Sequence, residues 1–351
     1  MSYEILMEKL GFPRSELMKK ILQCLMNEEG AKVASLLPGT VEEIAEKLGM
    51  EKEKVRKILE DLFVKGVVIP KDFKNREFFR FVRNIVQLHD ASLASERMND
   101  PEYARLWKEF IEREAHEAIV KTLVHNGRKV SRVVPAYHAI KDLPDVLPYE
   151  NIKEMIKAQK KIAVVPCSCR NVTDLLENGC RFTEEKVTDK NTWKCIQVGR
   201  GAEYTIERGS GIEITVEEAL KLIDEMEKDG LIHMWANTAK IVDPRISVNC
   251  NCCSDCCENF VSAKFSNVPM DQLLEKSRYI ALIDVEKCTG CQTCIERCHF
   301  DAIELYRPEG SKKFKAKVVE EKCFGCGVCV VGCKQNAIKL KAVRPPEFIP
   351  D

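Results

Sequence analysis

CTGCQTCIERC at Cys288–Cys298 and CFGCGVCVVGC at Cys323–Cys333 are the two stretches that decide how the last part of the chain folds. Each has the spacing C-x-x-C-x-x-C-x-x-x-C, and the second begins 35 residues after the first. The dipeptide Ala302-Ile303 recurs at the same offset as Ala337-Ile338. Because the repeat extends beyond the cysteines, the sequence predicts two copies of one folding unit.

This spacing is that of ligands to [4Fe-4S] clusters, because three close thiolates hold three corners of a cubane and a distant fourth closes it. Residues 278–351 therefore resemble a bacterial-type two-cluster ferredoxin. In that family the fourth cysteine of each run serves the other cluster. The resemblance implies two clusters with the ligand sets Cys288, Cys291, Cys294, Cys333 and Cys323, Cys326, Cys329, Cys298.

One position departs from the ferredoxin pattern. The family has Pro after the fourth cysteine, whereas this chain has His299 and Lys334 there. Ligation by the thiolates survives this change. We predict that His299 donates a hydrogen bond to a cluster sulfur, and the alternative is a partly exposed loop residue.

The pattern around the two runs predicts four strands, at 279–284, 303–306, 316–320 and 338–341. Lys313, Lys315 and Lys317 alternate with apolar residues in the third strand and before it. Outward lysines on an edge strand oppose aggregation, and they can also dock an acidic redox partner.

Composition narrows the class of protein. The 351 residues suffice for two or three domains with their own cores. Lys plus Arg and Asp plus Glu both number 55, so no net charge points to nucleic acid or membrane. Residues 1–15 lack an apolar signal core and no apolar run approaches membrane-spanning length, which predicts a cytoplasmic protein without membrane insertion.

Eighteen cysteines without an export signal favour metal ligation over disulfides. Besides the eight of the two runs, nine lie between residues 167 and 257. They predict one or more additional iron–sulfur clusters, or one cluster plus redox-active thiols, with zinc as the alternative metal. These nine are Cys167, Cys169, Cys180, Cys195, Cys250, Cys252, Cys253, Cys256 and Cys257.

Two cysteine-rich segments each follow a predicted strand, at 162–165 and 245–248. Since α/β sheets gather site residues at strand ends, we expect the two segments to meet. Arg170 beside Cys169 is predicted to bond a cluster sulfide or an anionic ligand, with a surface salt bridge as the alternative. Glycines 199, 201, 209 and 211 predict a hairpin without the strand-to-helix context of a dinucleotide site.

The N-terminal residues read as helices followed by a short strand, with a capping box at Thr40–Glu43 and helix stops at Gly49 and Gly66. Residues 1–80 therefore resemble a winged-helix module. The predicted third helix carries charges of both signs on its exposed side, which favours docking to a protein over binding to DNA. A further helix is predicted to begin at Asp100-Pro101.

We therefore expect a multidomain α+β protein with a winged-helix-like module (1–80), a helical then α/β cysteine-rich middle domain (81–277) and a ferredoxin domain (278–351). The arrangement is similar to ferredoxin-fusion proteins of anaerobes, and it implies an electron-transfer protein or a subunit of an oxidoreductase complex. The partner would be a redox enzyme. The alternatives are a redox-sensing regulator that binds DNA and a reductase whose middle cluster binds substrate.

Overall fold

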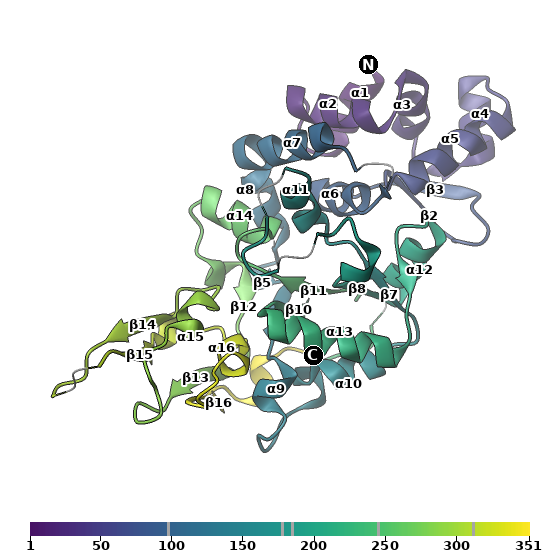
Figure 1. Ribbon diagram of the computed structural model, residues 1–351. Helices are drawn as coiled ribbons and strands as arrows, with labels where there is room; N and C mark the ends of the chain where they lie inside the picture. The colour runs from purple at the N-terminus through teal and green to yellow at the C-terminus, as the bar shows by residue number, and fades with distance from the viewer. Residues whose placement is uncertain (97–98, 177–178, 184–185, 244–245, 311–312) are drawn as a thin grey trace.

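The computed structural model of the chain describes residues 1–96, 99–176, 179–183, 186–243, 246–310 and 313–351. Figure 1 shows an N-terminal group of helices, a central part with a large sheet, and a C-terminal arm that carries both cysteine runs. The protein is thus a mixed α/β multidomain structure. Within the described residues, no helix is long and apolar enough to cross a membrane.

The N-terminal helices each turn one apolar face to a common core. Met18 and Leu22 of α2 are fully buried, as their helical spacing predicts. Thr40 and Glu43 form the predicted capping box of α4, and Gly49 ends that helix with a φ of 63°. The elements are α1 (Ser2–Lys9), α2 (Glu16–Leu25), α3 (Glu28–Ser35), β1 (Gly39–Thr40), α4 (Val41–Leu48), α5 (Lys52–Val64), β2 (Val68–Pro70) and β3 (Phe78–Phe81). The predicted order of helix, turn, helix and strand is present, and the winged-helix resemblance stays a prediction.

The next helices share the same core. Asp100 caps α7 by accepting a hydrogen bond from Glu102 N, and Pro101 begins the helix as predicted. Trp107 is 1% exposed and belongs to one hydrophobic cluster with Phe63. This core therefore includes residues from both sides of position 80. The elements are α6 (Ile85–Leu93), α7 (Pro101–Phe110), the π-helical turn η2 (Ile111–Ala115) and α8 (His116–Thr122).

The central part is built on a seven-stranded sheet in the order β12-β6-β10-β11-β8-β7-β9, in which only β12 and β6 pair in parallel. Its strands are β6 (Ser131–Val134), β7 (Ile162–Val165), β8 (Cys195–Val198), β9 (Ile212–Glu213), β10 (Ile232–Ala236), β11 (Val248–Cys252) and β12 (Leu274–Glu275). Figure 1 shows α10 and α13 on one side of the sheet and α11 on the other. The helices are α9 (Tyr137–Ile140), η3 (Pro148–Glu150), α10 (Ile152–Lys157), α11 (Ser168–Leu175), η4 (Lys190–Thr192), α12 (Arg200–Glu207), α13 (Val216–Asp229), α14 (Glu258–Phe265) and η5 (Met270–Gln272), and β4 (Val124–His125) pairs with β5 (Arg128–Lys129).

Two predicted elements of the central part differ in the structure. The strand expected at 245–248 begins at Val248 and ends at Cys252, while residue 245 lies outside the described residues. The hairpin expected at 199–211 is wrong, because α12 begins directly after β8. Gly199 makes that turn with a φ of 53°, and a side chain on Gly201 would collide with the Ser247 carbonyl oxygen. These glycines serve a tight turn and a close helix-to-sheet contact.

The arm contains the predicted strands, paired across the repeat. β13 (Tyr279–Ile283) pairs with β16 (Ile338–Ala342), and β14 (Ile303–Tyr306) pairs with β15 (Lys315–Val318). Short helices α15 (Thr293–Glu296) and α16 (Val328–Val331) each follow a cysteine, and η6 (Glu320–Lys322) and η7 (Pro346–Phe348) complete the arm.

Buried contacts hold the arm against the central part. Ala136 and Ala139 share one hydrophobic cluster with Leu340 of β16. Glu150 accepts a hydrogen bond from Tyr279 Oη at 3.1 Å and pairs with Arg278 Nε at 3.0 Å. Because these groups are nearly inaccessible to solvent, the arm and the central part pack as one unit.

Candidate metal centres

The arm encloses two cavities, each lined by four cysteines. Cys288, Cys291, Cys294 and Cys333 line one cavity, and Cys298, Cys323, Cys326 and Cys329 line the other. Each set takes three cysteines from one run and one from the other, as in the ligand sets that the ferredoxin resemblance implied. Four converging thiols are the donor set that a cubane needs.

The cavities differ from ordinary thiol environments in their polarity. Burial raises the pKa of Cys294 to about 11 and that of Cys326 to about 12. Thiols in such places become thiolates when a cation balances them, which fits metal ligation rather than free nucleophilic cysteines.

Backbone donors explain why the repeat extends beyond the cysteines. Ala302 N donates to Cys298 Sγ at 3.3 Å, and Ala337 N donates to Cys333 Sγ at 3.4 Å. These alanines stand at equivalent places in the two copies. Such N–H groups stabilise a thiolate and raise the potential of a cluster that it binds.

Six of the nine middle-domain cysteines form a second group, which we call the six-thiol ring. Neighbouring thiols hydrogen-bond to one another in the order Cys167, Cys169, Cys257, Cys252, Cys250 and Cys195. The last of them, Cys195, lies within electrostatic range of the first, Cys167. The two cysteine-rich segments therefore meet, as the sequence predicted. The members are Cys167, Cys169, Cys195, Cys250, Cys252 and Cys257.

Sheet register brings the ring together. β7 and β11 run in the same direction because both are antiparallel to β8 between them. The ends of β7 and β11 and the start of β8 thus lie at one edge. Within β11, Asn249 and Asn251 are buried, whereas Cys250 and Cys252 alternate to the other face.

Arg170 lies within electrostatic range of Cys167 in this ring. Its side chain is 3% exposed, so a surface salt bridge does not describe it. One guanidinium nitrogen donates to Thr192 O at 3.3 Å, and Nε has no hydrogen-bond partner among the described residues. A hydrogen bond with Cys169, opposed by burial and assisted by the charge of Arg170, lowers the pKa of Cys167. A buried cation with a free donor beside thiols fits an anionic group at the ring.

A buried acid and a buried base, Glu258 and His89, adjoin the ring at Cys169. Glu258 N donates to Cys169 Sγ at 3.4 Å, and the Glu258 carboxylate lies 2.9 Å from His89 Nδ1. Burial raises the pKa of Glu258 to about 7 against the pull of His89. The sequence offered no signal for this contact, because the two residues are far apart in the chain.

The other three cysteines, Cys180, Cys253 and Cys256, lie apart from the ring together with Asp255. Cys253 and Cys256 are 5% and 7% exposed. Hydrogen bonds with Cys253 and Cys256 lower the pKa of the Cys180 thiol. The nine cysteines thus divide into a set of six and a set of three, which their spacing alone did not predict.

His299 joins the arm to the loop that carries Cys253, Asp255 and Cys256. It is 6% exposed, so it is not a partly exposed loop residue. Its Nε2 donates to Gly230 O at 2.7 Å, and its Nδ1 accepts from Ser254 N at 3.1 Å. Both ring nitrogens are engaged by the central part, and so His299 has a bridging role in place of the predicted hydrogen bond to a cluster sulfur.

A buried polar contact fixes the strand that carries Cys250 and Cys252. Asn251 donates from Nδ2 to the carbonyl oxygens of Lys194 and Asn249. Its Oδ1 therefore accepts from His233 Nδ1, at 2.6 Å. Along 248–252 the buried asparagines alternate with the less buried cysteines, which shows the two faces of this strand.

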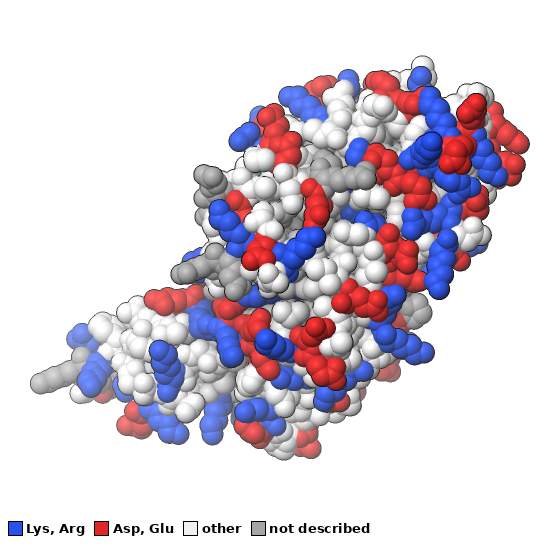
Figure 2. Space-filling model, turned by 45° about the vertical axis from the view of Figure 1, so that its right-hand side comes forward, with Lys and Arg blue, Asp and Glu red and all other residues white. Residues whose placement is uncertain are grey.

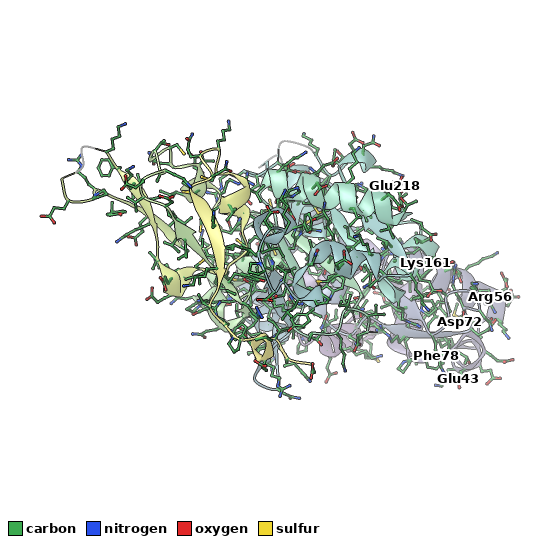
Figure 3. The ribbon with its side chains drawn as sticks, turned by 90° about the horizontal axis from the view of Figure 1, so that it is seen from below. Glu43, Arg56, Asp72, Phe78, Lys161 and Glu218 are labelled. Carbon is green, nitrogen blue, oxygen red and sulfur yellow. The ribbon has the colours of Figure 1, made fainter. Side chains whose placement is uncertain are left out.

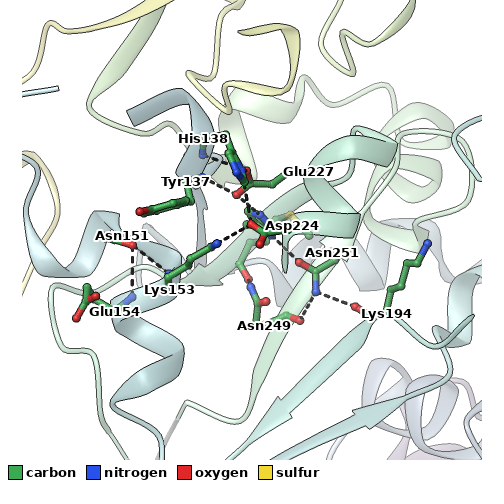
Figure 4. Close-up of polar contacts among 12 residues, drawn as sticks. Tyr137, His138, Asn151, Lys153, Glu154, Lys194, Asp224, Glu227, Asn249 and Asn251 are labelled. Carbon is green, nitrogen blue, oxygen red and sulfur yellow. Dashed lines mark hydrogen bonds and ion pairs between the residues drawn. The ribbon is translucent and has the colours of Figure 1, made fainter. Parts of the chain in front are cut away.

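Glu227 continues this polar chain toward the surface. It is fully buried on α13, and its carboxylate lies 3.3 Å from His233 Nε2 and 2.7 Å from His138 Nδ1 (Figure 4). It also accepts hydrogen bonds from the backbone N–H groups of Tyr137 and His138. Both ring nitrogens of His233 face oxygen atoms, so the imidazole links Asn251 to Glu227.

Comparison with known proteins agrees with the geometry of the arm. Residues 287–338 match the family model of the 4Fe-4S dicluster domain. The match spans both cysteine runs, so the arm is an iron–sulfur domain of ferredoxin type. None of the curated proteins searched matches the chain.

Proposed function

We propose that the protein transfers electrons between a partner redox enzyme and its own iron–sulfur clusters, and that the six-thiol ring holds the innermost of them. Bound clusters of this kind supply one-electron carriers, usually at negative potentials. The chain contributes thiolate ligands, backbone donors to the sulfurs and an apolar environment that excludes water. In this proposal, the six-thiol ring and the cavity lined by Cys298, Cys323, Cys326 and Cys329 hold neighbouring redox centres on the electron path.

One observation carries this proposal. A single hydrophobic cluster includes Cys326 of the arm and Cys257 of the ring. Between them, the phenyl groups of Phe300 and Phe324 stack with 3.9 Å between their centroids, and the centroid of Phe260 lies 5.7 Å from that of Phe300. A dry aromatic contact of this kind keeps two redox centres close and shielded from solvent, which suits electron transfer.

Exposure supports a direction for the path. Cys291 is exposed, whereas Cys323, Cys326 and Cys329 are buried. The cavity that contains Cys291 is therefore the one nearest to solvent, and we propose that the partner docks there. Cys294 and Cys329 lie in electrostatic range of each other, which supports transfer from the outer to the inner cavity.

The predicted lysines contribute unequally to a docking surface. Lys315 Nζ donates to the carbonyl oxygens of Val285 and Cys288, so it braces the outer cavity. Lys317 lies 3.3 Å from Glu304 Oε2 and is half exposed. Figure 2 shows Lys and Arg interspersed with Asp and Glu over the face drawn. A partner is thus expected to recognise shape and mixed charge together.

Metal analysis tests the proposal. We expect the anaerobically purified chain to contain about twelve or more irons with matching sulfide, because the arm alone accounts for about eight. Stepwise reduction followed by EPR spectroscopy should then give signals beyond those of the two arm clusters. A content of about eight irons per chain would confine the clusters to the arm and reject the claim for the ring.

The charge pattern of the N-terminal part favours protein docking over DNA binding. Arg56 pairs with Glu77 at 2.6 Å and Lys65 with Asp61 at 2.8 Å, so cations near α5 are neutralised locally. Figure 3 places Arg56 at the end of the molecule remote from the arm. This end is free to bind a second surface of the partner complex.

We expect neither the cluster-loaded nor the cluster-free chain to bind duplex DNA at low salt. Paired surface charges release few counterions from DNA, and strong binding requires unpaired cations. Fluorescence anisotropy with a labelled random-sequence duplex is the measurement. Tight binding that weakens steeply with added salt would instead favour a redox-sensing regulator.

A further inference from the structure

Cys180, Cys253, Asp255 and Cys256 place four possible ligand atoms within 4.8 Å of one another. Cys180 Sγ lies 3.8 Å from Cys253 Sγ and 4.0 Å from Asp255 Oδ1. Cys180 follows α11, and the other three stand between β11 and α14. A compact donor set thus joins two segments that are distant in sequence.

The donor set of this group favours one metal ion over a cubane, because it offers three thiols where a cubane needs four. With metal–sulfur bonds of about 2.3 Å and tetrahedral angles, two ligand sulfurs on one ion lie about 3.8 Å apart. The observed Cys180–Cys253 separation fits a single tetrahedral ion.

The carboxylate of Asp255 is oriented as a ligand would be. Its Oδ2 accepts a hydrogen bond from Arg181 N at 2.7 Å, which leaves Oδ1 toward Cys180. Backbone support of the non-ligating oxygen is the usual way in which proteins orient metal ligands. The nearby His299 is not a competing ligand, because Ser254 N occupies its Nδ1.

We propose that Cys180, Cys253, Asp255 and Cys256 form a mononuclear structural zinc site that is separate from the iron–sulfur centres. Three thiolates and one carboxylate complete the tetrahedral coordination that zinc prefers in closed sites. Zinc has no redox chemistry, so this site stands outside the electron path.

The position of the site gives it a purpose. Phe182, two residues after Cys180, packs on His299 with 4.1 Å between ring centroids. Ser254 lies between the ligands Cys253 and Asp255 in the chain, and its backbone N–H donates to Nδ1 of the same imidazole at 3.1 Å. The ion therefore holds together the two central-part segments that contact His299, the one with Phe182 and the one with Ser254. In this way it keeps the arm in a fixed position relative to the six-thiol ring.

The wild-type chain supplies the direct test. We expect about one zinc per chain after anaerobic purification, and zinc K-edge X-ray absorption should show three sulfurs at about 2.3 Å and one oxygen at about 2.0 Å. This edge reports zinc alone, whatever the iron content. Absence of stoichiometric zinc, or a shell of four sulfurs, would overturn the proposal.

Variants connect the zinc to these residues. We expect the double variant Cys180→Ser with Cys256→Ser to lose zinc and to keep its iron and EPR signals. Asp255→Asn should retain the thiolates and bind zinc at least tenfold more weakly in a chelator competition. Cys24→Ser and Asp271→Asn, both at exposed positions, are the matched controls and should keep full zinc. Zinc retained by the double variant, or iron lost from it, would contradict the assignment.

The site and the electron-transfer proposal fail independently. Replacement of Cys250, Cys252 and Cys257 by serine should lower iron and leave zinc unchanged, because three ring thiols are too few for a cubane. A chain with about eight irons and one zinc would reject the ring while supporting this site. A chain with about twelve irons and no zinc would do the reverse.

Discussion

Replacing Cys250, Cys252 and Cys257 together with serine is expected to leave about eight irons per chain and to abolish the iron above that number. All three residues belong to the six-thiol ring, and each hydrogen-bonds to neighbouring thiols there. Serine is a poor ligand for iron–sulfur clusters, and the three thiols that remain are fewer than the four that a cubane needs. Iron and sulfide analysis with EPR spectroscopy measures the loss.

The effect on electron flow separates a ligand from a structural residue. In the wild-type chain, rapid reduction should reach the arm first and the ring afterwards. In the serine variant the arm signals should appear at the same rate and the later phase should be missing. Cys24→Ser, in exposed surroundings on α2, is the control. A variant that keeps the wild-type iron content and both phases would show that the ring holds no cluster.

Replacing Glu227 with alanine is expected to lower the free energy of unfolding by about 3–5 kcal/mol. The carboxylate is fully buried between His138 and His233, and its loss leaves buried nitrogens without their acceptor. The shift of the anaerobic thermal midpoint, followed by circular dichroism, measures it. Glu217→Ala, at an exposed position of the same helix, should change the stability by less than about 0.5 kcal/mol.

Glu227 also makes the free energy of unfolding depend on pH. Burial tends to raise the pKa of Glu227, but hydrogen bonds and charge from His233, together with hydrogen bonds from His138, outweigh it and lower the pKa to about 2. Its folded pKa is below the ordinary value of 4.5, so its contribution to stability is complete above that value. The contribution is lost as the pH falls from about 4.5 to about 2.

Glu227→Gln isolates this contribution, because glutamine keeps the size and removes the charge. The stability difference between wild type and Glu227→Gln should be constant from pH 5 to 6 and shrink on acidification. Parallel stability curves down to pH 3 would contradict the assigned carboxylate role.

Local patterns predicted much of the chain. The capping box at Thr40 begins a helix where expected, since it depends on residues three apart. The strand at 162–165 was recognisable from its continuous apolar run. The alternation of Asn and Cys in 248–252 carried a strand signal as well, but the density of cysteines masked it.

Only the tertiary structure revealed the residues that support the metal centres. Glu227 and Asn251 are ordinary helix and strand positions in sequence, and their role follows from contact through His233. Asp255 stands among four cysteines in the sequence, and it is the hydrogen bond from Arg181 N that orients its carboxylate as a ligand. The contacts of Asn251 with His233 and of Asp255 with Arg181 join segments that are distant in sequence.

The two runs at Cys288–Cys298 and Cys323–Cys333 by themselves determined an iron–sulfur arm, because ligand spacing within one short loop is a local property. The resemblance they carry also gave the exchange of the fourth cysteines, which the two cavities reproduce. The division of the nine middle cysteines into six and three was decided by the tertiary structure alone. Antiparallel register sets which strand ends meet, and that register depends on contacts between distant segments.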